Sequence, residues 1–233
     1  SFRPFAPGTP SAGDGGGGLG AGGAVFVMHG ASLSITGGTL ANGTVVSGQG
    51  AESGMTGGAS DGQAYGAGIF IQGNQSITFG SGQTAGQTTT VSGDIADMTG
   101  SSDPSGQTGA GKVIVAGSGN VVLSGNNTYT GGTTIAGGVL ELANAQSAGT
   151  GAITFASGVH TTLQVDGTAI PTNTIDGFTF GDTIDLAGIA YDGSAQPNLA
   201  TGNHLQFTEN GHSYQINFDP AQSFTGGTFT LSP

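Results

Sequence analysis

Three aspartates in the last third of the chain are the residues whose type and spacing could do chemistry. Asp176, Asp182 and Asp185 lie close together in the sequence. Hydrolysis of a glycosidic bond needs two carboxyl groups several ångströms apart, one of them protonated. Asp182 and Asp185 are the closest such pair, but residues three apart on a strand face opposite sides of it. Their spacing therefore disfavours joint catalysis.

The same aspartates have two other interpretations. Turns and corners favour Asp because its carboxylate accepts hydrogen bonds from nearby backbone N–H groups, and we favour this reading. Calcium is the alternative, because it binds carboxylate oxygens. The sequence lacks both the glycine-aspartate nonapeptide and the twelve-residue helix-loop signature of calcium sites. We predict no cofactor, and Asp176, Asp182 and Asp185 stand as weak calcium candidates.

Other catalytic and metal chemistry has no anchor in the sequence. Cysteine is absent, so disulfides, thiolate metal sites and cysteine nucleophiles are excluded. No Gly-x-Ser-x-Gly elbow lies between a buried strand and a helix, so a serine nucleophile has no anchor. The four histidines share no metal-binding spacing: His29, His160, His204 and His212. Uronate lyases need cationic groups, and this chain has only Arg3 and Lys112. We predict that the chain is not an enzyme, and leave open an isopeptide cross-link at Lys112.

The charge balance excludes two classes of partner. The formal net charge is −12, and only 7% of the residues are charged, against about 25% in ordinary globular chains. Nucleic-acid affinity rests on cationic side chains that neutralise phosphates. No apolar run approaches the roughly 20 residues of a membrane helix. We therefore predict no nucleic-acid partner and no direct membrane insertion of this segment.

The elements that position these residues are predicted to be short strands. Glycine accounts for 49 of the 233 residues, and its clusters separate short β-branched runs. This alternation of turn and strand signals is typical of an all-β chain. Residues 139–146 are the one stretch with helical apolar spacing.

A repeated phrase suggests stacked coils. The phrase at residues 22–30 recurs at residues 66–73, and a second strand signal follows each copy. The 44-residue offset from Phe26 to Phe70 suits two coils of roughly 22 residues, within the period range of solenoids. In such a fold each coil pairs its backbone with the coils on both sides, and apolar side chains form the interior. The pattern predicts a β-solenoid.

The most specific motif lies in the middle of the chain. Residues 123–134 closely resemble the strand repeat of autotransporter passengers, whose hallmark reads L-S-G-x-N-T-Y-T-G-G-T-T. Every hallmark position is filled here, by Leu123, Ser124, Gly125, Asn127, Thr128, Tyr129, Thr130, Gly131, Gly132, Thr133 and Thr134. Residues 65–79 and 91–97 are also similar to the block that precedes this repeat. The resemblance covers about residues 20–156.

The resemblance implies a right-handed parallel β-helix on the outside of a Gram-negative cell. Export would use a β-barrel translocator encoded elsewhere in the precursor. The implied function is adhesion or the assembly of an extracellular matrix or biofilm. Its partners would be a host or matrix glycan, a protein surface, or further copies of the chain. Two alternatives stay open: a subunit of a self-assembling extracellular fibre, and a β-helix enzyme that acts on polysaccharides.

The texture of the sequence predicts three regions. Residues 1–20 form a Gly/Pro-rich extended arm, residues 21–158 the solenoid, and residues 159–233 a C-terminal β-rich module that caps or continues it. Glycine thins and strands lengthen in the last region. Within it, residues 209–212 separate two strand signals and predict a hairpin turn.

Overall fold

The computed structural model describes residues 20–49, 61–101 and 108–233. Over these ranges the chain forms strands and no α-helix, so the all-β prediction is confirmed there. The described residues accordingly contain no helix long and apolar enough to cross a bilayer. The arm predicted for residues 1–20 lies outside the described residues, apart from Gly20, which begins a short strand.

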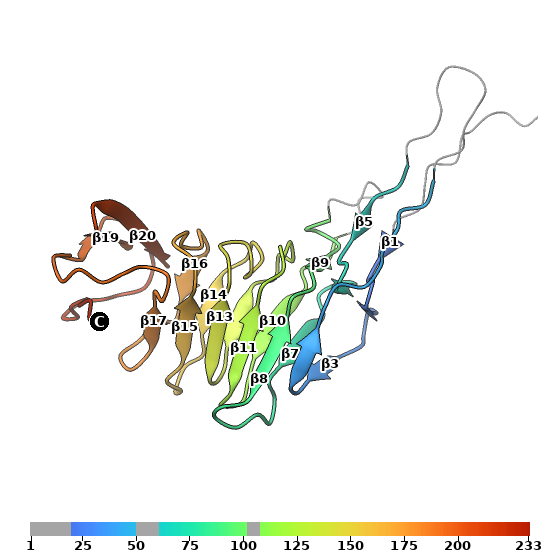
Figure 1. Cartoon of the computed structure of the whole chain (residues 1–233), viewed down its shortest axis with the longest axis horizontal. Helices are drawn as coiled ribbons and strands as arrows, with labels where there is room; N and C mark the ends of the chain where they lie inside the picture. Colours follow the sequence, from blue (N-terminus) through green and yellow to red (C-terminus); the bar gives the residue numbers. More distant parts are fainter. Residues whose placement is uncertain (1–19, 50–60, 102–107) are drawn as a thin grey trace, which may run out of the picture.

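Most strands lie in three sheets that run along an elongated stack (Figure 1). The three-stranded sheet contains β2 (Val25–Val27), β6 (Ile69–Ile71) and β9 (Ile95–Asp97). The six-stranded sheet contains β4 (Gly38–Leu40), β8 (Thr88–Val91), β11 (Asn120–Leu123), β13 (Val139–Leu142), β15 (Thr162–Val165) and β17 (Thr183–Asp185).

The nine-stranded sheet combines a parallel part with a C-terminal antiparallel part. Its parallel strands begin with β3 (Leu33–Ile35), β7 (Ser76–Phe79), β10 (Lys112–Val115), β12 (Thr133–Ile135), β14 (Ile153–Phe155) and β16 (Thr174–Asp176). It ends with β20 (His212–Phe218), β19 (His204–Glu209) and β18 (Asn198–Ala200). A further pair, β1 (Gly20–Ala21) and β5 (Ala64–Tyr65), is parallel.

Successive turns of the chain stack in register, as expected for a β-solenoid. In the nine-stranded sheet Val113 pairs with Thr133, Thr133 with Ile153, and Ile153 with Ile175, so the turns from β10 to β16 take about 20 residues each. The repeated phrase also stacks on itself, because β2 pairs with β6 and β3 pairs with β7.

The predicted period at the N-terminal end is wrong. Phe26 pairs directly with Phe70, so their 44-residue offset is one turn of the solenoid and not two. The extra length comes from the connection between β4 and β5, whose described residues, 41–49 and 61–63, lie outside the strands.

The core is a ladder of apolar side chains inside the stack. β7, β10, β11, β13 and β15 alternate buried and partly exposed residues, as expected of strands with one face inward. The buried ladder includes Ile77, Val113, Ile135, Ile153, Val121, Leu140 and Leu163. Residues 139–146, whose spacing was helical, form β13 and the turns that follow it, since pairing with β11 and β15 overrides that spacing.

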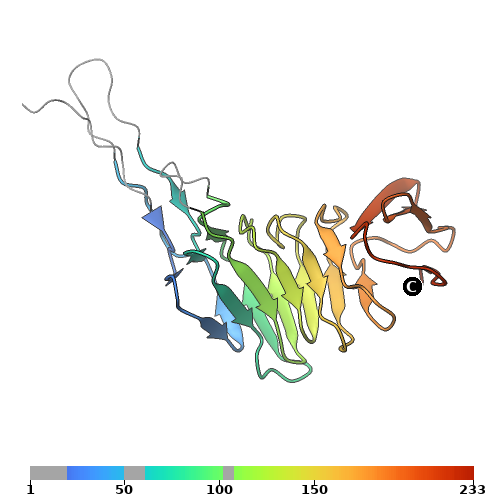
Figure 2. The same cartoon turned by 180° about the vertical axis from the view of Figure 1, so that it is seen from behind.

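The parallel stack continues beyond residue 158. β15 and β17 extend the six-stranded sheet, and β16 extends the nine-stranded sheet (Figure 2). The predicted boundary between residues 158 and 159 therefore falls between two strands of the stack, and the division into domains stays a prediction. Antiparallel pairings, β18 with β19 and β19 with β20, appear only after β17.

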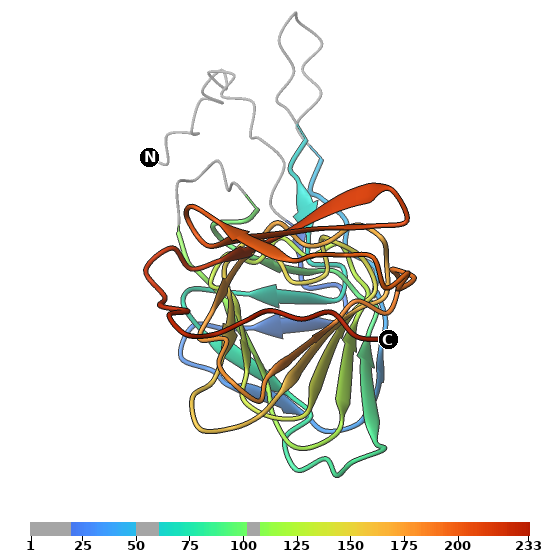
Figure 3. The ribbon, with the colours of Figure 1, turned by 90° about the vertical axis from the view of Figure 1, so that its left-hand side faces the viewer.

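The predicted C-terminal hairpin is confirmed. β19 and β20 pair antiparallel around Asn210 and Gly211, both with positive φ (51° and 77°), as in the two-residue turns that suit hairpins. β20 also pairs in parallel with β16. Viewed from the C-terminal end, this segment lies in front of the last coil (Figure 3). Phe218 is buried there and packs against Phe178, Phe224 and Phe229.

Candidate functional site: the coil corner and the C-terminal groove

The passenger-like motif forms the corner between β11 and β12. Leu123 and Tyr129 are fully buried in the core, and Thr133 and Thr134 begin β12. The motif thus makes the chain turn from one sheet into the next.

Asn127 bridges three turns of the solenoid at this corner. Its side chain is almost fully buried. Its Oδ1 accepts a hydrogen bond from the Ile95 N–H (2.7 Å), and its Nδ2 donates to the Ser147 carbonyl (2.5 Å). Ile95 and Ser147 belong to the turns before and after the motif, so one amide side chain joins all three.

Tyr129 is buried with its hydroxyl satisfied inside the core. The Tyr129 Oη lies 2.6 Å from Thr133 Oγ1, and Thr133 Oγ1 donates to the Ala148 carbonyl at 3.2 Å. Because the Thr133 proton goes to Ala148, Tyr129 donates to Thr133. Burial raises the pKa of Tyr129 far above its ordinary value, and the bond to Thr133 opposes this only in part. The phenol is therefore a structural group rather than an acid or base.

Asp97, to which the sequence analysis gave no role, accepts four hydrogen bonds at the same corner. It is fully buried at the end of β9. Its carboxyl oxygens accept from the backbone N–H groups of Gly100 (2.6 Å), Gly111 (2.9 Å) and Thr130 (2.6 Å), and from Thr130 Oγ1 (2.9 Å). Asp97 therefore ties the motif residue Thr130 to the preceding turn. In the sequence, the only feature that pointed to Asp97 was its position in residues 91–97, which resemble the block that precedes the passenger repeat.

Asparagine and aspartate side chains form a second row of contacts along the stack. Asn42 Oδ1 accepts from the Asp94 N–H, and Asp94 Oδ1 accepts from the Asn126 N–H, both at 2.8 Å. Further along, Asn144 Nδ2 donates to the Ser124 carbonyl at 3.0 Å. Each of these side chains satisfies a backbone group of a neighbouring turn, where the strands end and the sheet ladder stops.

Two of the three motif glycines, Gly131 and Gly132, allow the turns to approach closely. A Cβ on Gly131 would lie 2.5 Å from the Gly111 carbonyl oxygen. Gly132 has a φ of +85°, and a Cβ there would lie 2.7 Å from the Ala152 carbonyl oxygen. Glycine is therefore required by contact at both positions and also by backbone conformation at Gly132.

The three predicted aspartates do not form one site. Asp176 lies on β16 and Asp185 on β17, which belong to different sheets. Asp182 accepts from the N–H groups of Thr179 (2.9 Å) and Thr161 (3.1 Å), the arrangement expected of a turn residue. The described part of the chain contains no group of three or more potential metal-ligating side chains. The prediction of no cofactor stays a prediction, with these residues as the weak calcium alternative.

A carboxyl pair that the sequence analysis missed lies on the six-stranded sheet. Glu141, on the outward face of β13, accepts a hydrogen bond from Asn120 Nδ2 at 2.6 Å. Burial raises the pKa of Glu141, Asn120 opposes the rise, and the neighbouring Asp166 raises the pKa further through a hydrogen bond and charge repulsion. Carboxyl groups in direct contact lack the separation of about 5 Å or more that glycosidases use. The pair therefore does not support hydrolysis.

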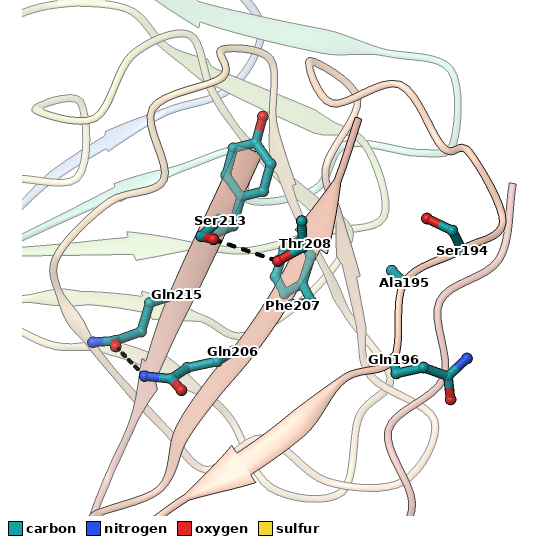
Figure 4. A pocket seen from close by; sticks show the side chains of 9 residues that line it. Ser194, Ala195, Gln196, Gln206, Phe207, Thr208, Ser213 and Gln215 are labelled. Carbon is teal, nitrogen blue, oxygen red and sulfur yellow. Dashed lines mark hydrogen bonds between the residues drawn. The ribbon is translucent and has the colours of Figure 1, made fainter. Parts of the chain in front are cut away.

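The C-terminal segment contains a polar groove (Figure 4). Its volume is about 770 Å³, and it lies between residues 194–196 and the β19–β20 hairpin. Gln206 and Gln215 lie side by side on the two strands, joined by a hydrogen bond of 3.0 Å from Gln206 Nε2 to Gln215 Oε1. Gln196 stands on the opposite side of the groove (Figure 4). Every lining residue is uncharged: Ser194, Ala195, Gln196, Gln206, Phe207, Thr208, Ser213, Tyr214 and Gln215.

Acidic contacts hold the loop beside this groove. Asp192 accepts hydrogen bonds from the N–H groups of Ser194 (2.7 Å) and Asn210 (2.7 Å). Bonds from Ser194 and Asn210 lower the pKa of Asp192 to about 2. The buried Glu209 accepts from the Asp192 N–H at 2.9 Å. These bonds fix residues 192–194 against the hairpin turn, directly before the lining residues 194–196.

Comparison with known proteins identifies the motif. Residues 113–142, which span β10 to β13, match the family model described as a passenger-associated-transport-repeat. No curated protein and no solved structure matches the chain. The matched range contains the whole corner built by Asn127, Tyr129 and Thr130. The chain therefore carries a passenger-associated-transport-repeat, consistent with the autotransporter passenger repeat family that its motif resembles.

Proposed function

We propose that this chain is a segment of a secreted bacterial surface protein, an autotransporter passenger that holds a rigid extended shape and mediates adhesion or matrix assembly. The observation that carries the proposal is the passenger repeat at residues 113–142, whose strands pair in parallel with strands of the turns on both sides. The repeat family is not an enzyme family, and its name refers to transport of passengers. The repeat supports secretion to the cell surface.

Two finer features belong to the proposal. We expect a right-handed coil, because crossover connections between parallel strands are right-handed in about 98% of cases. We also expect the β19–β20 hairpin to cap the solenoid. The buried Phe218 and its aromatic neighbours support this, because they cover apolar residues that would otherwise lie at the end of the core.

Surface display tests the function. The full chain is expressed between a secretion signal and an outer-membrane translocator, and cells that display the translocator alone are the control. We expect the chain to become accessible to added protease, and the cells to bind a glycan- or protein-coated surface more than the control does. Retention inside the envelope, or display without any gain in adhesion, would contradict the proposal.

Experiments on the purified chain distinguish this proposal from the two alternatives, a fibre subunit and a polysaccharide-acting enzyme. Electron microscopy of the purified chain should show isolated rods, whereas filaments would favour the fibre subunit. Turnover of a polysaccharide that is lost in the Asp182→Ala variant would favour an enzyme.

A further inference from the structure

We infer that an extended peptide with apolar side chains and a lysine or arginine binds as an added strand at the free edge of β17. The inference deepens the proposed function, on which it rests, by naming a class of partner and its place on the chain. The site is a second groove, which we call the end groove, between β17 and the β19–β20 hairpin. Its volume is about 650 Å³, within the range of ligand sites.

The two large sheets end differently beyond the last coil (Figure 1). The nine-stranded sheet continues past β16 through β20, β19 and β18, whereas the six-stranded sheet ends at β17, which pairs only with β15 among the described strands. The Thr183 N–H donates to the Thr161 carbonyl of the preceding turn. Strand geometry therefore directs the N–H and carbonyl of Ile184 toward the opposite, unpaired edge. Such an edge is a template for a further strand, and peptides commonly bind by adding one.

Most residues that line the end groove are apolar, as the inner face of an added strand requires. The apolar side chains nearest to β17 and on the hairpin are Ile184, Leu186, Leu205, Phe207, Ile216 and Phe218. Ile184 and Leu186 are only partly buried, so an added strand would cover them further. Sugar hydroxyls against these side chains would lose hydrogen bonds to water without replacement. The lining and the free backbone edge together favour a peptide over a saccharide.

The charge of the end groove favours a cationic side chain. The lining contains Asp182, Asp185 and Glu209, and it contains no Lys, Arg or His. Glu209 is only 2% exposed. Its Oε2 accepts from the Asp192 N–H, whereas its Oε1 has no hydrogen-bond partner among the described residues. A buried oxygen without a donor is costly, and an ammonium or guanidinium group in the groove would supply the donor.

The same charges disfavour a second copy of the chain as the occupant. Two copies would bring together formal net charges of −12 each. The strand that a stacked copy would present to β17 is β4, at the far end of the six-stranded sheet, and β4 (Gly38–Leu40) contains no Lys or Arg. A cationic peptide is attracted by the same field that repels a copy.

Binding of capped heptapeptides to the purified full chain tests the inference. Each peptide has Lys at its centre, Val, Leu or Phe at its second and sixth positions, and Thr elsewhere, so that Lys and the apolar side chains share one face of a strand. We expect calorimetry in about 150 mM salt, which screens non-specific attraction, to show saturable binding of at least one peptide. Failure of every peptide to bind would overturn the site.

Altered peptides separate the three causes of binding. Thr in place of both apolar residues keeps the charge, and Glu in place of Lys reverses it. N-methylation of alternate backbone amides removes the donors of one strand edge, and each alternate set is tested. We expect at least tenfold weaker binding after the first two changes and after N-methylation of the set that faces β17. Undiminished binding after either side-chain change, or after both N-methylations, would overturn the proposal.

Substitutions in the chain locate the site. Glu209→Gln keeps an acceptor for the Asp192 N–H and removes the charge, and we expect it to weaken the best peptide about tenfold. Glu141→Gln is the matched control, because it removes the same charge from β13, outside the end groove. Equal affinities of the two variants, with unchanged circular dichroism spectra, would overturn the role of Glu209. If Glu209→Gln does not fold, Asp185→Asn, at an exposed residue of the same groove, should weaken binding at least threefold, and an unchanged affinity would overturn the location.

Two further outcomes separate the site from other occupants and from the proposed function. Sedimentation of the chain alone should show a monomer, and a dimer that the best peptide dissociates would mean that a second copy occupies the edge. Cells that display the chain are also allowed to adhere in the presence of that free peptide. Loss of adhesion supports the site. Adhesion that persists unchanged overturns the end groove as the adhesive surface and leaves the proposed function standing.

Discussion

At the scale of single residues, the corner depends on buried polar side chains more than on any reactive group. Asn127, Thr130 and Thr133 form hydrogen bonds to Ile95, Asp97 and Ala148, respectively. Asp97 accepts four hydrogen bonds in all. Buried polar groups stabilise a fold when their partners are complete, and each becomes costly once a partner is removed. The motif is therefore a structural lock.

Replacement of Asp97 by Ala should be strongly destabilising. It leaves three backbone N–H groups and the Thr130 hydroxyl without their acceptor, at about 1–3 kcal/mol for each buried group left unsatisfied. We expect the free energy of unfolding to fall by about 3 kcal/mol or more, measured by urea denaturation. Asp185→Ala is the control, since Asp185 is exposed, and should change it by less than about 0.5 kcal/mol. Equal effects of the two variants would refute the role of Asp97.

The Glu141–Asp166 pair should make stability depend on pH. The pKa of Glu141 is raised in the folded chain, so its contribution is present below the unfolded pKa and is lost as pH rises through the folded pKa. Glu141→Gln keeps an acceptor for Asn120 and removes this loss. We expect the variant to have a higher melting temperature than the parent at pH 7 and a similar one at pH 4. A lower melting temperature at pH 7 would count against the pair.

The sequence predicted the motif residues, but not what most of them contact. The hallmark pattern identifies Asn127 and Thr130 by type, whereas the partner of Thr130, Asp97, lies 33 residues away. The number of residues in the intervening turn decides whether such groups meet, and a local pattern does not contain it. Glu141 and Asp166 were missed for the same reason, because they come together only when neighbouring turns stack.

At the scale of elements, close stacking of turns limits which residues the corners accept. Gly132 and Gly158 both have positive φ, +85° and +78°. A Cβ on Gly132 would meet the Ala152 carbonyl, whereas a Cβ on Gly158 would have nothing within 4 Å. Substitution at either position strains the backbone, but only substitution at Gly132 also produces a clash with a neighbouring turn. Comparing the two positions therefore separates the destabilisation caused by strain from that caused by the clash.

We expect Gly132→Ala to lower the melting temperature more than Gly158→Ala does. Gly158→Ala should lose only the roughly 1 kcal/mol of an unfavourable φ, and Gly132→Ala should add the displacement of β14 to that loss. Thermal unfolding followed by circular dichroism measures both. If the two melting temperatures fall equally, close contact between turns is not what requires glycine at position 132.

Strand positions were more predictable than the path between them. The repeated phrases stack as β2 on β6 and β3 on β7. The alternation of apolar residues can be recognised in a short stretch of sequence, and it also sets the register in which two strands pair. The period was wrong at this end, because the β4–β5 connection adds residues without adding a turn. The hairpin was predictable because its turn residues, Asn210 and Gly211, specify it locally.

At the scale of the whole molecule, the charge is unbalanced. The chain has 14 acidic side chains and two Lys or Arg residues. Such an excess destabilises a compact state through self-repulsion, which salt screens. We expect the melting temperature to rise when sodium chloride is increased from about 10 mM to about 300 mM, a range over which the screening length falls below 10 Å. A fall in melting temperature over this range would show that attractive pairs dominate instead.

The regular register of the stack also has a mechanical consequence. Hydrogen bonds between turns point along the length of the rod, so tension on the two ends of the chain loads one interface at a time. Each turn between β10 and β16 that peels away frees about 20 residues, or roughly 70 Å of contour length at about 3.5 Å per residue. In single-molecule pulling, the turns from β10 to β16 should yield as a series of evenly spaced force peaks. In the proposed adhesive role, a cell held by this chain would be held by a tether that lengthens stepwise under load and absorbs work at each step, whereas a single rupture would release it at once.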